Sequence, residues 1–169
     1  NDAYYDGGGI YVIGNAFISN TQFLYNKASY GNGGGVKVDG SAFITSSLFS
    51  GNLSDNENCG GAFIGANAFI LNSTFTGNQS LKAGGGLWVG ANATFINSTV
   101  SKNTSRQYIG GGAFVGGHVW VDHSTFSENA TGGYFLNQHG GGLYINAGLD
   151  ASNSTFISNT AYGSGGGVF

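Results

Sequence analysis

Short apolar segments alternate with bends rich in glycine and asparagine along the whole chain, in a pattern that repeats about every 26 residues. A triplet of glycines opens each repeat, with Cys59 in place of one glycine. The triplets lie at residues 7–9, 33–35, 59–61, 84–86, 110–112, 140–142 and 165–167. Their spacing is 25 or 26 residues, apart from one interval of 30. A fixed period of this length is typical of repeat architectures, in which each repeat is one structural unit.

Within each repeat, three short segments rich in Val, Ile, Phe and Thr predict β-strands. In the third repeat these are residues 62–64, 68–70 and 73–75, and the turn residues Ala66 and Asn67 separate the first two. A helix long enough to span one repeat would be interrupted by the glycine triplets. Three strands and three bends per repeat therefore predict one coil of a parallel β-helix.

The predicted fold is all-β, a single-stranded parallel β-helix with three short strands per coil and about six coils of 25 to 30 residues. The coils begin near residues 7, 33, 59, 84, 110, 140 and 165. We expect residues 1–169 to form one continuous repeat segment without an internal domain boundary. Solenoids normally carry polar caps, and neither end of this chain resembles one. We therefore expect a part of a longer protein, with end-to-end stacking of subunits as the alternative.

Two columns of like residues follow from this register. A phenylalanine stands sixteen residues after the start of each triplet, with Val100 in the fourth copy, and an asparagine follows three residues later. A side-chain amide can accept a hydrogen bond from one coil and donate to another, so stacked amides form a ladder that satisfies buried polar groups. We predict such a structural ladder at Asn26, Asn52, Asn78, Asn103, Asn129 and Asn159.

Strand alternation points the central residue of most first and second strands outward, and most of these residues are aromatic. The candidate interface comprises Tyr11, Phe63, Trp88, Phe114 and Tyr144 on first strands and Phe17, Phe43, Phe69 and Trp120 on second strands. An exposed apolar strip of this extent is typical of a partner surface. We expect copies of the same chain or other surface proteins as partners, and stacking on carbohydrate rings as a lesser alternative. In the competing interpretation, residues 130–139, with Tyr134 and Phe135, fold over part of the strip.

Asn-x-Ser/Thr signals for N-linked glycosylation are frequent. Their predicted positions in the coil separate inaccessible signals from accessible ones. Four belong to the predicted ladder and should be inaccessible. The other four are expected on the outward phase or in a turn, and they would carry glycans if the source is eukaryotic. These candidates are Asn72, Asn92, Asn97 and Asn153.

Composition and charge exclude several classes of protein. Only 8% of residues are charged, the net charge is -3, and the five basic residues form no cluster, so no nucleic-acid partner is predicted. No apolar run reaches the length of a membrane span, so we expect no membrane insertion by this segment. An aromatic content of 14% argues against disorder. We predict no cofactor and no metal, and we interpret Cys59 as a small residue that fills a tight site.

An enzyme is the main alternative, because polysaccharide-cleaving proteins share the β-helix. Their chemistry requires clustered acids with calcium or basic groups beside them. The carboxylates of this chain are scattered over different coils, and the nearest approach to a cluster is His118, Asp122 and His123. We interpret that trio as a solvated turn and predict no catalytic residues.

An ice-binding protein is a less favoured alternative. Flat columns of outward threonines suit ordered water, and Thr74, Thr99, Thr125 and Thr155 form such a column. The column is interrupted at Leu48 and Gln22, and potential glycosylation signals flank it. Polysaccharide binding without cleavage also stays open.

The combination of a glycine triplet with a Phe-x-x-Asn step resembles the polymorphic outer membrane protein (Pmp) repeat of chlamydial surface adhesins. The matching steps are residues 23–26, 49–52, 75–78, 126–129 and 156–159, and the copy with Val100 departs from the pattern. The resemblance covers the whole chain. It implies a right-handed β-helix used in adhesion or as a surface scaffold, and hence an extracellular or cell-surface location.

These observations together predict a non-catalytic structural scaffold or adhesive segment of a surface protein. We expect it to assemble laterally or end to end through the outward aromatic strip.

Overall fold

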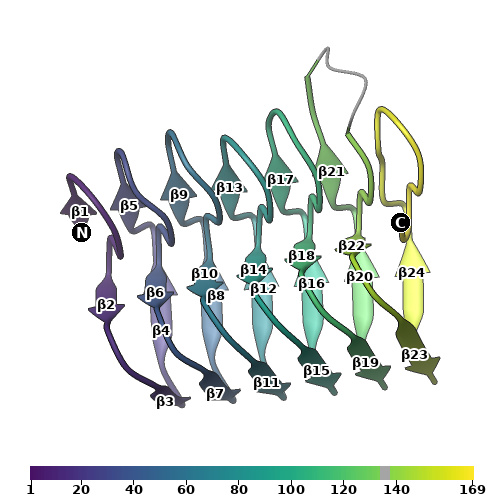
Figure 1. The fold of residues 1–169 in the computed structure, drawn as a ribbon, viewed down its shortest axis with the longest axis horizontal. Helices are drawn as coiled ribbons and strands as arrows, with labels where there is room; N and C mark the ends of the chain where they lie inside the picture. The colour runs from purple at the N-terminus through teal and green to yellow at the C-terminus, as the bar shows by residue number, and fades with distance from the viewer. Residues whose placement is uncertain (134–137) are drawn as a thin grey trace.

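The computed structural model of the protein describes residues 1–133 and 138–169 and shows a parallel β-solenoid. Successive coils lie side by side along one axis, with the N-terminus in the first coil and the C-terminus in the last (Figure 1). The strands form four parallel sheets of six strands each. This arrangement confirms the predicted all-β fold class.

The three predicted strands of each coil are present, and each forms its own sheet. Sheet 1 comprises β2 (Ile10–Val12), β6 (Val36–Val38), β10 (Ala62–Ile64), β14 (Leu87–Val89), β18 (Ala113–Val115) and β22 (Leu143–Ile145). Sheet 2 comprises β3 (Ala16–Ser19), β7 (Ala42–Thr45), β11 (Ala68–Leu71), β15 (Ala93–Ile96), β19 (Val119–Asp122) and β23 (Leu149–Ser152). Sheet 3 comprises β4 (Gln22–Leu24), β8 (Leu48–Ser50), β12 (Thr74–Thr76), β16 (Thr99–Ser101), β20 (Thr125–Ser127) and β24 (Thr155–Ile157).

A fourth, two-residue strand follows the asparagine of each coil, in addition to the three that the sequence predicts. Sheet 4 comprises β1 (Asp2–Ala3), β5 (Lys27–Ala28), β9 (Leu53–Ser54), β13 (Gln79–Ser80), β17 (Thr104–Ser105) and β21 (Ala130–Thr131). Two residues are too few to show any hydrophobic periodicity. The strand also lies at the start of the segment whose length varies, which the sequence analysis interprets as loop.

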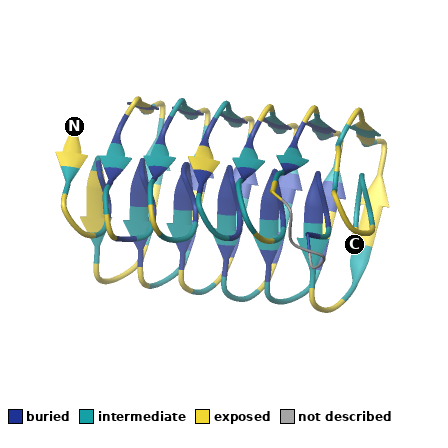
Figure 2. Ribbon diagram, turned by 90° about the horizontal axis from the view of Figure 1, so that it is seen from above, coloured by how far each residue is buried: buried dark blue, intermediate teal, exposed yellow. Residues whose placement is uncertain are grey.

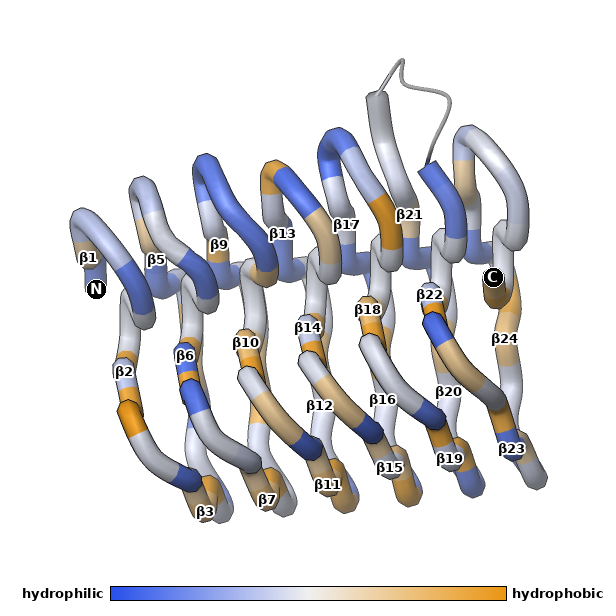
Figure 3. Tube along the Cα trace, in the orientation of Figure 1, coloured by the Kyte–Doolittle hydropathy of each residue, from blue (hydrophilic) through white to orange (hydrophobic). Residues whose placement is uncertain are grey.

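Every strand pairs in register with the equivalent strand of the neighbouring coil. On sheet 1, for example, Phe63 lies opposite Lys37 on one side and Trp88 on the other. The pattern of hydropathy therefore recurs from coil to coil, as the tube in Figure 3 shows. Like residues consequently form columns parallel to the axis of the solenoid.

Strand alternation fills the interior with one set of columns, and burial is greatest in the middle coils (Figure 2). On sheet 1 the two end residues of each strand point inward, so that Leu87 and Val89 are fully buried. On sheet 3 the central residue points inward, and Phe49 and Phe75 stack with ring centroids 4.5 Å apart. Val100 occupies the same buried column, where a smaller apolar side chain also fits.

Three corners of each coil contain a residue with positive φ, which turns the chain sharply between strands. Between sheets 2 and 3 these residues have φ between 47° and 50°, and they are Asn20, Ser46, Asn72, Asn97, His123 and Asn153. Between sheets 3 and 4 they are Tyr25, Gly51, Gly77, Lys102, Glu128 and Ser158. The third corner is the first residue of each triplet, where Cys59 has a φ of 62°.

The remaining triplet glycines are required because neighbouring coils approach closely there. A Cβ atom on Gly85 would overlap the carbonyl oxygen of Gly111 and the backbone of Thr104. A Cβ atom on Gly86 would lie 2.8 Å from the side-chain Cγ of Asn103. Only glycine lets the coils stack at the spacing of a β-sheet at this corner. The predicted covering of the aromatic strip by Tyr134 and Phe135 lies outside the described residues.

Candidate binding surface

The aromatic residues predicted at the centre of the first strands form one outward column on sheet 1. From Phe63 to Tyr144 the rings stack on one another, beginning with Phe63 and Trp88 at a centroid distance of 4.2 Å. Trp88 and Phe114 follow at 5.5 Å, and Phe114 and Tyr144 at 5.6 Å. These four side chains are half-buried because each covers part of its neighbour. The strip is therefore a rigid ridge of ring edges that runs along the axis.

A second outward column lies on sheet 2, and it is interrupted. Phe17, Phe43 and Phe69 stack at 5.4 and 4.9 Å. Thr94 takes the next place in register, and Trp120 follows it. Trp120 is 43% exposed and Phe17 is 72% exposed, so this column is more open to solvent than the first.

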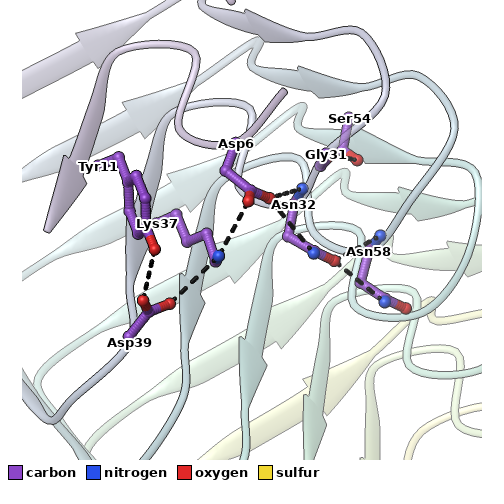
Figure 4. A network of polar contacts seen from close by, with 8 residues as sticks. All are labelled: Asp6, Tyr11, Gly31, Asn32, Lys37, Asp39, Ser54 and Asn58. Atoms are coloured by element: carbon purple, nitrogen blue, oxygen red, sulfur yellow. Dashed lines mark hydrogen bonds and ion pairs between the residues drawn. The ribbon is translucent and has the colours of Figure 1, made fainter. Parts of the chain in front are cut away.

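At its N-terminal end, the sheet 1 column changes from aromatic to charged. Lys37 occupies the place between Tyr11 and Phe63, and its Nζ lies 4.5 Å from the centroid of the Tyr11 ring. The same ammonium group lies 2.9 Å from Oδ2 of Asp6 and 3.2 Å from Oδ1 of Asp39, and the Tyr11 hydroxyl donates to Asp39 at 2.6 Å (Figure 4). A compact network of two carboxylates, one ammonium and one phenol therefore ends the apolar strip.

The electrostatics of this network favour its charged form. The hydrogen bond from Tyr11, followed by the contact with Lys37, lowers the pKa of Asp39. Burial acts to lower the pKa of Lys37, but the hydrogen bonds and charges of Asp6 and Asp39 outweigh it and raise that pKa. Lys37 therefore stays cationic and Asp39 anionic across the neutral range. The stabilisation from Asp39 is present above the ordinary carboxyl pKa and is lost as the pH falls through its lowered value.

Two hollows lie on the outer face of sheet 2. One has a volume of about 440 Å³ and is bordered by Phe43, Phe69 and Thr94, with Asn67 and Asn92 along its margin. The other has a volume of about 600 Å³ and is bordered by Thr94, Trp120, Asp122 and Asp150. Thr94 borders both hollows, so they meet end to end along the axis. We call the combined depression the sheet 2 groove.

The structure divides the trio of His118, Asp122 and His123 between two separate histidine–carboxylate contacts. His118 lies with Nε2 3.0 Å from Oδ2 of Asp150, in the next coil, and its ring packs on Trp120 at 4.3 Å. His123 instead pairs through Nδ1 with Oδ2 of Asp122 at 2.9 Å. The two histidines thus act on different carboxylates.

Asp122 is held by neighbours from two coils. The hydroxyl of Ser152 donates to Oδ1 at 2.7 Å, and Nδ2 of Asn153 donates to the same oxygen at 3.2 Å. The Ser152 hydroxyl, then His123 and Asn153, lower the pKa of Asp122 to about 2. Its carboxylate is therefore a fixed anion on the border of the sheet 2 groove.

The described residues contain no group of potential metal ligands, and the cysteine of the chain lies in the interior. Within 1–133 and 138–169, no three His, Cys, Asp or Glu side chains gather closely enough to hold a metal ion. Cys59 is fully buried, and burial raises the pKa of its thiol, so it stays protonated in the interior. Its Sγ contacts the carbonyl oxygen of Gly86 at 3.4 Å, as befits a small residue in a tight site.

The predicted asparagine column is a continuous hydrogen-bonded ladder. Asn78 accepts from the backbone N–H and from Nδ2 of Asn52 at 3.0 and 2.9 Å. Its own Nδ2 donates to Oδ1 of Asn103 and to the carbonyl oxygen of Phe49, both at 2.9 Å. The same pattern links all six predicted members, which are Asn26, Asn52, Asn78, Asn103, Asn129 and Asn159. Asn1 extends the ladder by one coil, donating to Asn26 at 2.8 Å.

A second buried ladder, which the sequence analysis missed, lies at the corner between sheets 2 and 3. The hydroxyl of Ser73 accepts the N–H of Ser47 at 3.1 Å and donates to the carbonyl oxygen of Leu71 at 2.8 Å. The column comprises Thr21, Ser47, Ser73, Ser98, Ser124 and Ser154. These residues stand at a constant fourteen positions after the start of each triplet, so the signal was present in the sequence.

The serine ladder gives three of the four candidate glycosylation signals a structural role. In each Asn-Ser-Thr triplet the asparagine takes the positive-φ corner, the serine joins the ladder, and the threonine begins a strand of sheet 3. Asn72, Asn97 and Asn153 are exposed at that corner, and Asn92 is exposed in the turn before β15. The threonine column of Thr74, Thr99, Thr125 and Thr155 lies in register on the outer face of sheet 3.

Residues 72–90 match the Chlamydia polymorphic membrane protein repeat. This segment includes the third Phe-x-x-Asn step and the triplet that follows it, and the parallel solenoid is consistent with such repeats. The resemblance inferred from the sequence is therefore confirmed over this stretch. No curated protein and no solved structure matches the chain.

Within the part of the chain that the structure describes, no helix has the length and hydrophobicity needed to span a bilayer.

Proposed function

We propose that this chain is a non-catalytic, rigid scaffold segment of a cell-surface protein, which makes lateral contact with a second copy of itself through the aromatic column of sheet 1. The observation that best supports this proposal is the outward aromatic stack, which stays in register over four successive coils and comprises Phe63, Trp88, Phe114 and Tyr144.

The interior supports the role of scaffold. Two buried ladders satisfy polar groups at the corners, and every strand is paired with its equivalent. Such a frame holds outward side chains at fixed spacing, so partner binding costs little conformational entropy. The matched repeat is named for a membrane protein of Chlamydia, which favours a location at the cell surface.

The chemistry of the ridge supports a protein partner. From Phe63 to Tyr144 the column contains no charged side chain, and its stacked rings offer continuous apolar area. Desolvated aromatic residues dominate the binding energy of protein interfaces. The charged network around Lys37 marks one end of the ridge and would fix the register between two copies.

Self-association in solution tests this proposal. Replacing both Trp88 and Phe114 with serine removes the two central rings of the ridge, and we expect at least a tenfold weaker self-association constant in sedimentation equilibrium. The matched control is Phe17→Ser, which removes an exposed ring from sheet 2 and should leave association unchanged. A wild-type protein that is monomeric at high concentration, or a double variant that associates as before, would contradict the proposal.

A further inference from the structure

The sheet 2 column lacks one ring in the middle of its aromatic stack. Phe69 and Trp120 stand two coils apart in register, and Thr94 occupies the place between them. Coils repeat at about 4.8 Å, so the positions of the two aromatic residues are separated by about 9.6 Å along the axis. A ring placed above Thr94 would lie about 4.8 Å from each, close to the 4.9 Å between Phe43 and Phe69.

The two rings that flank this gap have few partners of their own. Phe69 stacks with Phe43 on its other side. Among the described residues, the only aromatic ring that packs on Trp120 is the imidazole of His118. Among the described residues, no aromatic side chain stands between Phe69 and Trp120 in the register of sheet 2, and Thr94 borders both hollows of the sheet 2 groove.

Polar groups line the margins of the groove at the same level. Asn67 and Asn92 use their side-chain oxygens to accept the backbone N–H of the next coil, at 3.2 and 2.8 Å. Within the described part of the chain their Nδ2 groups have no hydrogen-bond partner, so they remain available as donors. On the far side of Trp120, the exposed carboxylate of Asp150 is a strong acceptor, and His118 holds it in place.

The negative charge of the groove limits which ligands can bind there. Asp122 and Asp150 are the only charged side chains that border the two hollows among the described residues. An anionic polymer would be repelled by this pair of carboxylates. A pyranose ring has an apolar face of C–H bonds that suits aromatic rings and hydroxyls at its edge that suit amides and carboxylates.

We propose that the sheet 2 groove binds an uncharged glycan chain along the solenoid axis, with one pyranose ring above Thr94 between Phe69 and Trp120. An aromatic side chain from a protein is the less favoured occupant, because amides and a carboxylate border the slot where a protein contact would need apolar margins. This site is separate from the sheet 1 ridge, so each can fail without the other.

The two tryptophans allow a direct test. In a Trp88→Phe background, produced in bacteria so that Asn92 carries no glycan, Trp120 is the only indole and reports on its own surroundings. The probes are three neutral hexasaccharides, made of β-1,4-linked glucose, mannose or N-acetylglucosamine, with a polygalacturonate oligomer as the anionic probe. We expect a saturable change in Trp120 fluorescence with at least one neutral probe and none with the anionic one.

The decisive variant is Thr94→Phe, which fills the slot with the missing ring and continues the aromatic stack. It should keep the circular dichroism spectrum and a melting temperature at least as high as the parent, and lose at least tenfold in affinity for the neutral probe. Thr99→Phe, on the outer face of sheet 3 and outside both hollows, is the matched control and should bind as the parent does. The proposal is overturned if no neutral hexasaccharide binds at millimolar concentration, if the anionic probe binds as well, or if Thr94→Phe binds unchanged.

Discussion

At the scale of single residues, the asparagine ladder shows how one side chain can be indispensable in every coil. Each amide both accepts and donates across coils, and all of them point the same way along the axis. Because such bonds polarise one another, an aligned chain of amides is stronger than isolated pairs. The Asn78 Nδ2 group donates two hydrogen bonds, to Asn103 and to Phe49, whereas a serine hydroxyl in the same place has one hydrogen to donate and an ionised aspartate has none.

Replacing Asn78 with alanine should therefore be strongly destabilising. The variant leaves the backbone N–H of Asn52, the amide oxygen of Asn103 and the carbonyl oxygen of Phe49 short of a partner in the interior. Each unsatisfied buried group costs about 1–3 kcal/mol, so we expect a loss of about 3 kcal/mol or more in the free energy of unfolding. Urea denaturation measures this loss in the free energy of unfolding.

The control for this variant is Gln79→Ala, one residue further on, where the side chain is exposed. Its stability should change by less than about 0.5 kcal/mol. Equal effects at the two positions would show that the ladder contributes nothing specific.

Single residues at the corners were harder to foresee. Tyr25, Lys102 and Glu128 take positive φ at the corner before the asparagine, although such residues seldom adopt it. Gly51 and Gly77 occupy the equivalent places in two other coils. The register with those glycines, more than the identity of each side chain, determines the backbone there.

At the scale of elements, no strand of this protein is long enough to be stable alone. Strands of two to four residues are held only by their equivalents in adjacent coils. The spacing of the coils therefore matters more than the composition of any strand, and the glycine triplets control that spacing. The triplets are recognisable in the sequence, and the structure shows which backbone atoms require them.

A pair of glycine substitutions separates close approach from general chain flexibility. Gly85→Ala would push a methyl group into the carbonyl oxygen of Gly111 and the backbone of Thr104, none of which can move without breaking pairing. We expect a loss of at least about 2 kcal/mol in thermal or urea unfolding.

Gly14→Ala provides the comparison, since nothing lies within 4 Å of a Cβ at that exposed turn. That substitution should be neutral or stabilising by about 0.4–1 kcal/mol, because it reduces the entropy of the unfolded chain. If Gly85→Ala were tolerated as well as Gly14→Ala, the proposed steric role of the triplets would be wrong.

At the scale of the whole molecule, the solenoid is nearly one-dimensional, because each coil contacts mainly its two neighbours. Its stability is then approximately a sum over coils and the interfaces between them. Ion pairs add cross-links over this frame, such as Arg106 to Asp55 at 3.0 Å. Whole coils should therefore be removable as units.

Deleting residues 59–83 removes one complete coil and joins Asn58 to Gly84, so that β6 can pair with β14. We expect a folded protein with the same circular dichroism spectrum per residue, shorter by about 4.8 Å in solution scattering and less stable to urea.

A deletion of residues 59–71 gives the contrast, because it removes half a coil and brings strands of different sheets into the same register. This variant should not fold. Loss of structure in the whole-coil deletion would show that the coils are not equivalent units.

Sequence alone determines the period, the strands of sheets 1 to 3, the inward phenylalanine and asparagine columns and the outward aromatic residues. It can do so because each of these features repeats in every coil, and parallel pairing in register places like over like. The two-residue strands of sheet 4 needed the tertiary structure, since a strand of that length leaves no pattern. The break in the second aromatic column at Thr94 can be read from the sequence, but the hollows beside it and the division of His118 and His123 between two carboxylates also needed the tertiary structure. These last features occur once, and they arise where one coil differs from its neighbours, so only contacts between coils decide them.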